Sequence, residues 1–370
     1  MNFSPNFDIA ALVIESILPN NKVLYDDQGI PSVMVYIPKM SYADLGLGDS
    51  TDTFPAFIVN GQEVEGVYIS KYQNVMYNNR AYSLGGKDPR TSINIDQAQA
   101  YCQNKGAGWH LMTRWEWALL AHWCKHNNCM PKGNNNYGKD ASEESRYHAV
   151  PATHGAAGSA DEGKILRVLT GSGPLSWSHD GTHEGIWDLN GNVHEWVRGI
   201  RNVYGELQVF VDNNGVDSSV SQAAASGDWK CISAVDGSYL TPDGSGTTSN
   251  AIRARYKTNH WEWGIDTAAD GTDVYKGHVL ENVTCSASIS EKGKFILQAL
   301  GLFKYDTTAG AYGGDYFYWS SIDAERVVCC GGGYSYGANA GVFFCHGSNS
   351  RTDAYGSIGF RSAFVKLPTA

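Results

Sequence analysis

GIWDLNGNVHEWVRG, residues 185–199, is the stretch of sequence that decides the fold of this chain. It carries an Asn-Gly-Asn turn at 190–192 between two tryptophans that can anchor the turn in a core. Asp188 and Glu195 flank the turn, so their carboxylates can converge on it. Two carboxylates and the carbonyls of a tight loop can bind a hard cation such as calcium. The same residues can also form a turn that side-chain hydrogen bonds stabilise, and the pattern leaves both interpretations open.

The sequence before this stretch predicts strands and then two capped helices. Strand-like runs begin at residue 32, and Asn60-Gly61 is a good hairpin turn between two of them. Asn94 is the expected N-cap of a first helix, with Gln97 three residues later and Gly106 at its end. A T-x-x-E capping box at 113–116 begins a second helix. This helix is apolar nearly all round, so we expect its tryptophans in the core.

The remaining segments give the domain organisation. Residues 1–31 predict an N-terminal helix, over 8–18, and a linker, which either docks a partner or packs on the domain. Residues 128–175 are rich in Asn, Gly, Ser and His and predict long loops. Residues 202–310 mix alternating runs with polar, Gly/Ser-rich stretches, which indicates an insertion in a core domain.

Composition and charge exclude several classes of protein. The chain has 370 residues, of which 42% are hydrophobic, enough for one large domain with a sizeable core. Its net charge is −10 and it has no run of Lys and Arg, so we expect no nucleic-acid partner. It has no apolar run of the roughly 20 residues that span a bilayer. The apolar stretch near the N-terminus lacks a preceding basic region, so we expect no signal peptide.

The eight cysteines are scattered and do not form a dense disulfide framework. Cys124 and Cys129 lie close to His122 and His126, which raises the alternative of a zinc site. Their spacing matches no common structural zinc motif. The interpretation that the spacing favours is free, partly buried thiols.

Taken together, these segments resemble the formylglycine-generating enzyme and sulfatase-modifying-factor family. The resemblance covers residues 32–200 and 316–370, and its motifs occur in the family's order. The motifs are VMVYIPKM, VYISKYQNVMYNNRAY, INIDQAQAYCQ, WHLMTRWEWALLAHW, residues 185–199, CCGGGY at 329–334 and IGFRSAF at 358–364. Residues 112–114, Met-Thr-Arg, depart from the family's Pro-Thr-Glu run. The resemblance implies an α+β, C-type-lectin-like fold over residues 32–370, loop-rich, with a large insertion at 202–310.

The resemblance also implies a structural calcium ion. In family members, calcium is held by the equivalents of Asp188, Gly191, Val193 and Glu195. Side chains serve at the first and last positions, and backbone carbonyls at the middle two. All four residues here are compatible with these roles, because calcium prefers oxygen ligands.

The resemblance does not extend to the family's catalytic cysteines. Alignment on the Gly-Gly pair at 331–332 puts Tyr336 and Gly341 at their positions, and neither residue can bind copper as a thiolate. A related branch uses non-haem iron, but the chain shows no obvious facial triad of histidines and a carboxylate. We therefore expect no catalysis. The alternative is an oxidoreductase of the sulfatase-modifying type, either formylglycine-generating or iron-dependent.

Residues 333–357 predict a binding surface. Tyr, Ser, Gly, Asn, His and Asp dominate them, as in an antibody paratope, although a polar loop with incidental aromatics has a similar composition. The segment from YWSS to IGFR is similar to the variable proteins of diversity-generating retroelements, which display side chains diversified by adenine-directed mutagenesis. The resemblance implies that residues 331–332 and 358–361 of this chain do not vary. The expected variable, ligand-binding positions are Gly333, Tyr334 (alternatively a scaffold aromatic), Ser335, Tyr336, Phe344, His346, Ser348, Asn349, Asp353, Tyr355, Gly356 and Ser357.

The function expected from these features is non-catalytic binding of a ligand or receptor. The resemblance implies a receptor-binding protein of a phage tail, located in the virion, or a recognition protein on a bacterial cell surface. The expected partner is a host-surface protein or glycan. The N-terminal segment would attach the chain to a tail or form a homo-oligomer. A purely structural tail or adhesion module is a further alternative.

Overall fold

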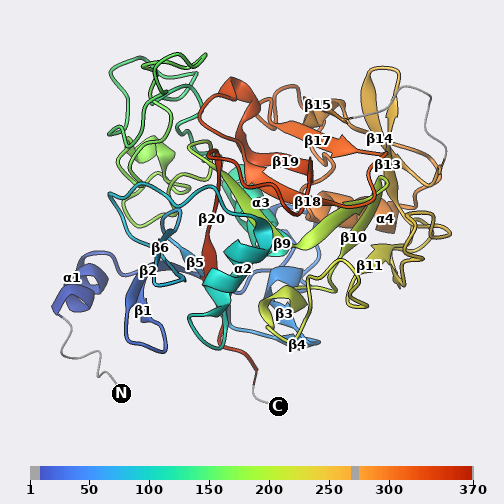
Figure 1. The fold of residues 1–370 in the computed structure, drawn as a ribbon. Coiled ribbons are helices and arrows are strands. Elements are labelled where there is room, and N and C mark those ends of the chain that lie inside the picture. Colours follow the sequence, from blue (N-terminus) through green and yellow to red (C-terminus); the bar gives the residue numbers. More distant parts are fainter. Residues whose placement is uncertain (1–8, 268–274, 369–370) are drawn as a thin grey trace.

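The turn at 190–192 leads directly into the middle of a large sheet (Figure 1). The computed structural model describes residues 9–267 and 275–368, and within them this sheet has twelve strands. They are β9 (His194–Val203), β10 (Glu206–Val209), β11 (Lys230–Ile232), β12 (Tyr239–Leu240), β13 (Arg253–Lys257), β14 (His260–Gly264), β15 (Tyr275–Val279), β16 (Thr284–Cys285), β17 (Tyr316–Ser320), β18 (Arg326–Gly331), β19 (Gly341–Asn349) and β20 (Ile358–Phe360). Their main order is β15-β17-β19-β18-β9-β10-β13-β14-β16. β19, which contains several of the expected variable positions, therefore lies between β17 and β18.

A second sheet has the strand order β1-β2-β5-β21-β8. Its strands are β1 (Asn21–Tyr25), β2 (Pro31–Pro38), β5 (Gly66–Ser70), β8 (Trp109–Leu111) and β21 (Ser362–Phe364). Two short hairpins accompany it, formed by β3 (Ile58–Val59) with β4 (Gln62–Glu63) and by β6 (Val75–Tyr77) with β7 (Arg80–Tyr82). Only Arg361 separates β20 from β21, so the chain passes from the large sheet to the small one at this residue.

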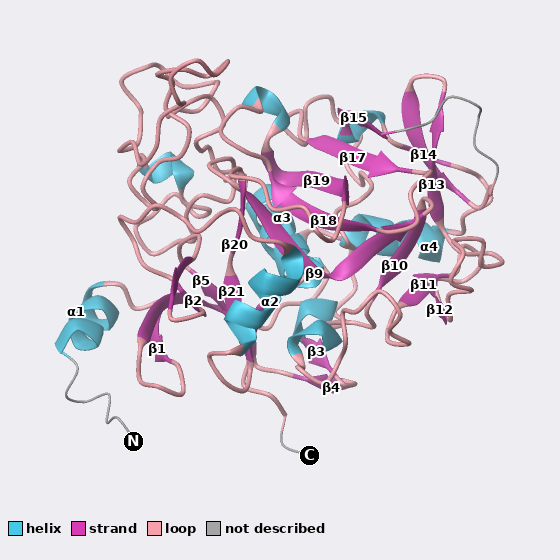
Figure 2. Ribbon diagram, viewed as in Figure 1, coloured by secondary structure: helices cyan, strands magenta, loops and turns pink. Residues whose placement is uncertain are grey.

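The described residues form four α-helices (Figure 2). They are α1 (Ile9–Ile17), α2 (Ile95–Gln103), α3 (Arg114–His126) and α4 (Glu291–Ala299). Both predicted capping boxes are confirmed, at 94–97 for α2 and at 113–116 for α3. The Asn60-Gly61 hairpin and the long loops of 128–175 are confirmed as well. With few helices, many short strands and long loops, the molecule is α+β and loop-rich, as expected for a C-type-lectin-like fold.

Helix α3 is buried on nearly all sides, as its composition predicts. The Trp117 indole donates a hydrogen bond to the Val342 carbonyl of β19 at 2.7 Å. The buried Arg114 guanidinium donates to the carbonyls of Leu300 and Gly301 and to the Cys330 sulfur. These bonds satisfy a buried charge, and they connect α3 to β19, to β18 and to the segment that follows α4.

Two predictions about the domain organisation, for residues 1–31 and 202–310, are wrong in part. Residues 21–31 are not simply a linker, because β1 lies at 21–25 and pairs with β2 along its whole length. β1 is an edge strand with only a few apolar residues, which gives a weak pattern. The segment 202–310 does elaborate the core, but within the described residues it contributes seven strands, β10 to β16, to the large sheet. It also contains α4, capped by Ser290, which we did not expect.

Three further properties bear on function. All eight cysteines are free, six of them buried and two half-buried, as the spacing predicts. In the part of the chain that the structure describes, the helices are too short or too polar to cross a bilayer. The predicted N-terminal helix is confirmed over Ile9–Ile17, whereas Asp8 lies outside the described residues.

The cap of α3 gives a first testable prediction. Thr113 Oγ1 accepts a hydrogen bond from the Glu116 amide and donates one to Asn213 Oδ1 at 2.6 Å, in a fully buried setting. We expect Thr113→Val to lower the free energy of unfolding by about 2–3 kcal/mol, because it removes a cap and leaves a buried acceptor unsatisfied. Asn94→Ala, which removes the more exposed cap of α2, should cost only about 1 kcal/mol. Urea denaturation measures both, and equal losses would contradict the buried role of Thr113.

Candidate ligand-binding site

The turn beneath the candidate site is fully enclosed by the protein. Asp188 and Asn192 both have positive φ, 63° and 60°, a conformation that Asp and Asn tolerate better than most residues. Gly191 has φ 77°, and a Cβ there would lie 2.2 Å from the Asn134 carbonyl oxygen. The turn therefore requires glycine at this position both for its backbone conformation and for its close contact with the loop at 134.

Four oxygens of this turn converge on the side-chain amide of Gln73, which follows β5. The Gln73 Nε2 atom lies 3.1, 3.4 and 3.2 Å from the carbonyl oxygens of residues 188, 191 and 193, and 3.0 Å from Glu195 Oε1. Asn192 Nδ2 donates to Gln73 Oε1 at 2.8 Å, which fixes the orientation of the amide. An amide has two hydrogens, so the four acceptors share them.

The charge of Glu195 is balanced by Arg361. Arg361 Nη2 donates to Glu195 Oε1 at 2.7 Å and Nε donates to Oε2 at 2.8 Å, a bidentate pair with both side chains buried. The same guanidinium donates to the Ser70 carbonyl of β5 and to the Trp187 carbonyl. Arg361 therefore joins the small sheet, the turn and β9.

The residues present do not fit a calcium ion in this arrangement. The point on which the carbonyls of Gly191 and Val193 converge is filled by the Gln73 amide, and both oxygens of Glu195 are bonded to Arg361. Asp188 instead accepts a hydrogen bond from the Gly171 amide, and burial raises its pKa to about 6. Calcium prefers six to eight oxygens and little competition from donors. Of the two interpretations of the turn, the hydrogen-bonded one matches the geometry.

We expect the unfolding temperature to be the same in excess calcium and in excess chelator, because the Gln73 amide already satisfies the turn. Gln73→Met, which keeps the volume but removes the donors, should lower the free energy of unfolding by about 2–4 kcal/mol. Gln99→Met on the partly exposed surface of α2 is the matched control and should change little. A calcium-dependent rise in unfolding temperature of the wild-type protein would contradict this account.

The expected variable positions lie on β19 and on the two loops at 333–340 and 350–357. The structure places them in two groups. Exposed or half-exposed are Tyr334, Ser335, Tyr336, Asp353, Tyr355, Gly356 and Ser357. Buried are Gly333, Phe344, His346, Ser348 and Asn349. The expectation that the Phe344 ring faces a ligand is wrong, because its side chain is 0% exposed and the loops and neighbouring aromatics cover this face of β19.

The covered face of β19 holds an aromatic cluster. Phe344 contacts Tyr336, Tyr318 and the His194 ring at centroid distances of 5.4, 6.1 and 5.2 Å. His346 lies beside Tyr318 at 4.8 Å. His194 and Tyr318 come from β9 and β17, and sequence reasoning missed both. No local pattern marks them, because only the order of strands in the sheet brings them beside β19.

The backbones of both candidate loops are held by distant segments. The Tyr137 amide donates to the Tyr334 carbonyl at 2.7 Å, and the Gly337 amide donates to the carbonyl of residue 135 at 2.8 Å. The second loop receives bonds at its carbonyls from three donors, namely Ser92 N to Tyr355, Arg167 Nη1 to Gly356 and His194 N to Ser357. Since the bonds involve main-chain atoms of the loops, side chains there can change without loss of these bonds.

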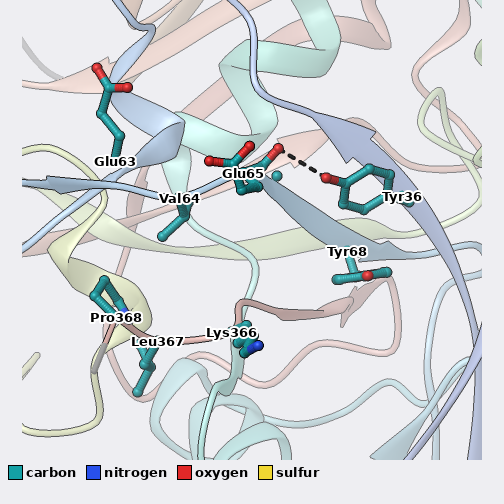
Figure 3. A pocket seen from close by; sticks show the side chains of 9 residues that line it. Tyr36, Glu63, Val64, Glu65, Tyr68, Lys366, Leu367 and Pro368 are labelled. Carbon is teal, nitrogen blue, oxygen red and sulfur yellow. Dashed lines mark hydrogen bonds between the residues drawn. The ribbon is translucent and has the colours of Figure 1, made fainter.

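Two hollows adjoin the candidate loops. One of about 330 Å³ is polar, lies next to the loop at 350–357, and includes Asp88, Arg90, Ser92 and Arg167 in its lining. A smaller one of about 230 Å³ lies between residues 130–142 and 338–342. A third pocket of about 360 Å³ is on the small sheet, where the Tyr36 hydroxyl donates to the Glu65 carbonyl (Figure 3). It contains none of the expected binding residues.

No family model matches the chain, and no curated protein matches it. Among solved structures, it is similar to variable protein 1 of Treponema denticola, with 11% identity over 93% of this chain and 99% of that one, and a TM-score of 0.31. It is similar to the U1 variant of a major tropism determinant, with 11% identity over 93% and 71%, and a TM-score of 0.30. It is also similar to PvdO of Pseudomonas aeruginosa, with 13% identity over 93% and 98%, and a TM-score of 0.30. Similarity at this level carries no argument about what the chain binds.

Proposed function

We propose that this chain is a non-catalytic binding protein that recognises a ligand or receptor with the loops at 333–340 and 350–357. The observation that carries the proposal is the difference between the main chain and the side chains of these loops. Their main chains are fixed by hydrogen bonds with residues 92, 135, 137, 167 and 194, whereas several of their side chains are exposed to solvent. A fixed backbone with free side chains suits recognition, because little conformational entropy is lost on binding.

Within this surface, tyrosines are the expected source of affinity. Tyr355 is 56% exposed, while Tyr334 and Tyr336 are half-exposed and stand on rigid neighbours. Aromatic side chains on a rigid support carry a large share of binding energy in protein interfaces. The polar groove of about 330 Å³ beside Tyr355 adds Arg90, Arg167 and Asp88 as hydrogen-bonding groups.

We further propose that the exposed positions vary between copies of the protein and that the partner is a host-surface protein or glycan. The resemblance of the segment to retroelement variable proteins supports both parts. The location that fits is a phage tail, with a bacterial surface as the alternative. Helix α1 supports attachment through the N-terminal segment, because Ile9, Leu12 and Ile17 expose 77%, 63% and 68% of their surface. Attachment would be to a tail component or to a second copy of the chain.

The oxidoreductase alternative finds little support in the thiols near the closing motif. Tyr336 and Gly341 stand where the family's catalytic cysteines are expected. The thiols of Cys330 and Cys345 are buried, and burial raises their pKa to about 12 and about 11. A buried, protonated thiol is a poor nucleophile and a poor redox group.

Sequencing of this locus across a population of its source tests the variation. We expect substitutions to cluster at the exposed positions, above all Ser335, Tyr355 and Gly356, and to trace to adenines of a nearby template repeat. The flanking residues at 331–332 and 358–361 serve as the internal control and should be constant. If residues 333–357 are as constant as their flanks, these positions are not diversified. The protein would then be a fixed adhesin or a divergent enzyme.

Truncation of Tyr355 tests the binding face. We expect Tyr355→Ala to weaken binding of the labelled protein to intact host cells by about tenfold or more, as for an interface hot spot. The unfolding temperature should stay within about 2 °C, because the side chain is largely exposed. Val235→Ala is the matched control, since Val235 is 64% exposed in the segment between β11 and β12. Equal binding by the wild type and Tyr355→Ala, with Ser335→Arg also neutral, would place the site elsewhere.

A further inference from the structure

Three potential metal ligands meet at the aromatic cluster, to which the two histidines among them belong. They are His194 of β9, Cys329 of β18 and His346 of β19, and one ligand atom of each lies within 4.8 Å of the other two. All three side chains are buried. The strands that carry them are neighbours in the large sheet, in the order β19-β18-β9 (Figure 1).

The register of these strands explains why the three side chains share one face. Cys329 is paired with His346 on one side and with Trp196 on the other. His194 is two residues from Trp196, and side chains two residues apart on a strand point to the same face. A register shift in β18 between Val327 and Cys329 adjusts the alignment of the strands just before the cysteine. The neighbouring Cys330 belongs to the opposite face, where its sulfur accepts a hydrogen bond from Arg114.

The hydrogen bonding of the three side chains leaves ligand atoms that are not fully used. The His194 side chain is only 3% exposed, and its Nδ1 atom has no hydrogen-bond partner among residues 9–267 and 275–368. A buried polar atom left without a partner costs on the order of 1–3 kcal/mol. The Cys329 sulfur accepts a hydrogen bond from Asn349 Nδ2 at 3.3 Å, and a sulfur that accepts this bond still has lone pairs for a second interaction.

We propose that His194, Cys329 and His346 bind one divalent transition-metal ion of the zinc class. Two imidazoles and one thiolate are nitrogen and sulfur ligands that zinc prefers, and they suit calcium poorly. Three protein ligands leave the fourth tetrahedral position to a water molecule or to an atom of a bound ligand. On binding, the thiol proton leaves to solvent and the sulfur–metal bond forms, with no change of oxidation state.

Such an ion would connect the predicted binding face to the centre of the sheet. It would tie β19, which carries His346, to β9 and β18 beside the Tyr336 and Phe344 rings, which contact the His194 ring. Metal binding depends on these three side chains. It can therefore be tested independently of whether the loops recognise a binding partner.

Titration of the chelator-treated protein with Co²⁺ tests the proposal. We expect one equivalent of Co²⁺ to bind, to produce the absorption band of a cobalt–thiolate bond, and to be displaced by Zn²⁺. Cys329→Ser should abolish the band, and His346→Asn should weaken binding by at least about tenfold through loss of a ligand. Cys129→Ser and Cys285→Ser, which remove the two half-buried thiols, are matched controls and should keep the band.

The absence of a cobalt–thiolate band in the wild-type protein, or its survival in Cys329→Ser, would overturn the proposal. Loss of the band in Cys129→Ser would instead assign the metal to the thiols at 124 and 129 and would also overturn it. Circular dichroism checks that each variant is folded. If Cys329→Ser does not fold, His194→Phe and His346→Asn decide the matter, because zinc should raise the unfolding temperature of the wild type but of neither variant.

Discussion

The buried ion pair between Glu195 and Arg361 is the interaction on which the rest of the structure depends. Arg361 lies where the C-terminal segment leaves the large sheet and enters the small one, and its guanidinium also binds carbonyls of Ser70 and Trp187. Loss of either partner would leave a charge in a water-free environment, which costs several kcal/mol. The Gln73 side-chain amide completes the junction by donating hydrogen bonds to the carbonyl oxygens of the turn. The two sheets and the turn therefore have one relative arrangement.

This junction explains how the molecule supports a surface that can change. β9 begins immediately after the turn, and the His194 amide at its start holds the second candidate loop through the Ser357 carbonyl. Helix α3 supports the sheet from the opposite face, through Trp117 to β19 and through Arg114 to β18. The order of the loops is thus supplied by residues outside them, which leaves exposed side chains such as Tyr355 with few structural duties. Below the loops, the packed rings of Phe344, His346 and His194 form a floor that is not itself exposed.

Much of the local structure could be predicted from sequence because its signals are local. Capping boxes at 94–97 and 113–116 and the hairpin at Asn60-Gly61 each depend on residues within four positions of one another, and all three are present. The elements that were not predicted from the sequence also have physical explanations. β1 is an edge strand that needs its partner β2 to be recognisable, and α4 lies in a segment whose polar, glycine-rich surroundings conceal a nine-residue helix.

What the sequence by itself determined is the set of local conformations, the burial of α3 and the position of the candidate loops along the chain. What only the tertiary structure decided is which residues meet. Gln73 lies more than a hundred residues before the turn that it fills, and it takes the place expected for calcium. Phe344 reads as a display residue but is covered by Tyr336 and Tyr318, while His194, Cys329 and His346 come together only through the strand order. The physical reason is that burial and ligand geometry depend on long-range strand pairing, and no local spacing encodes that pairing.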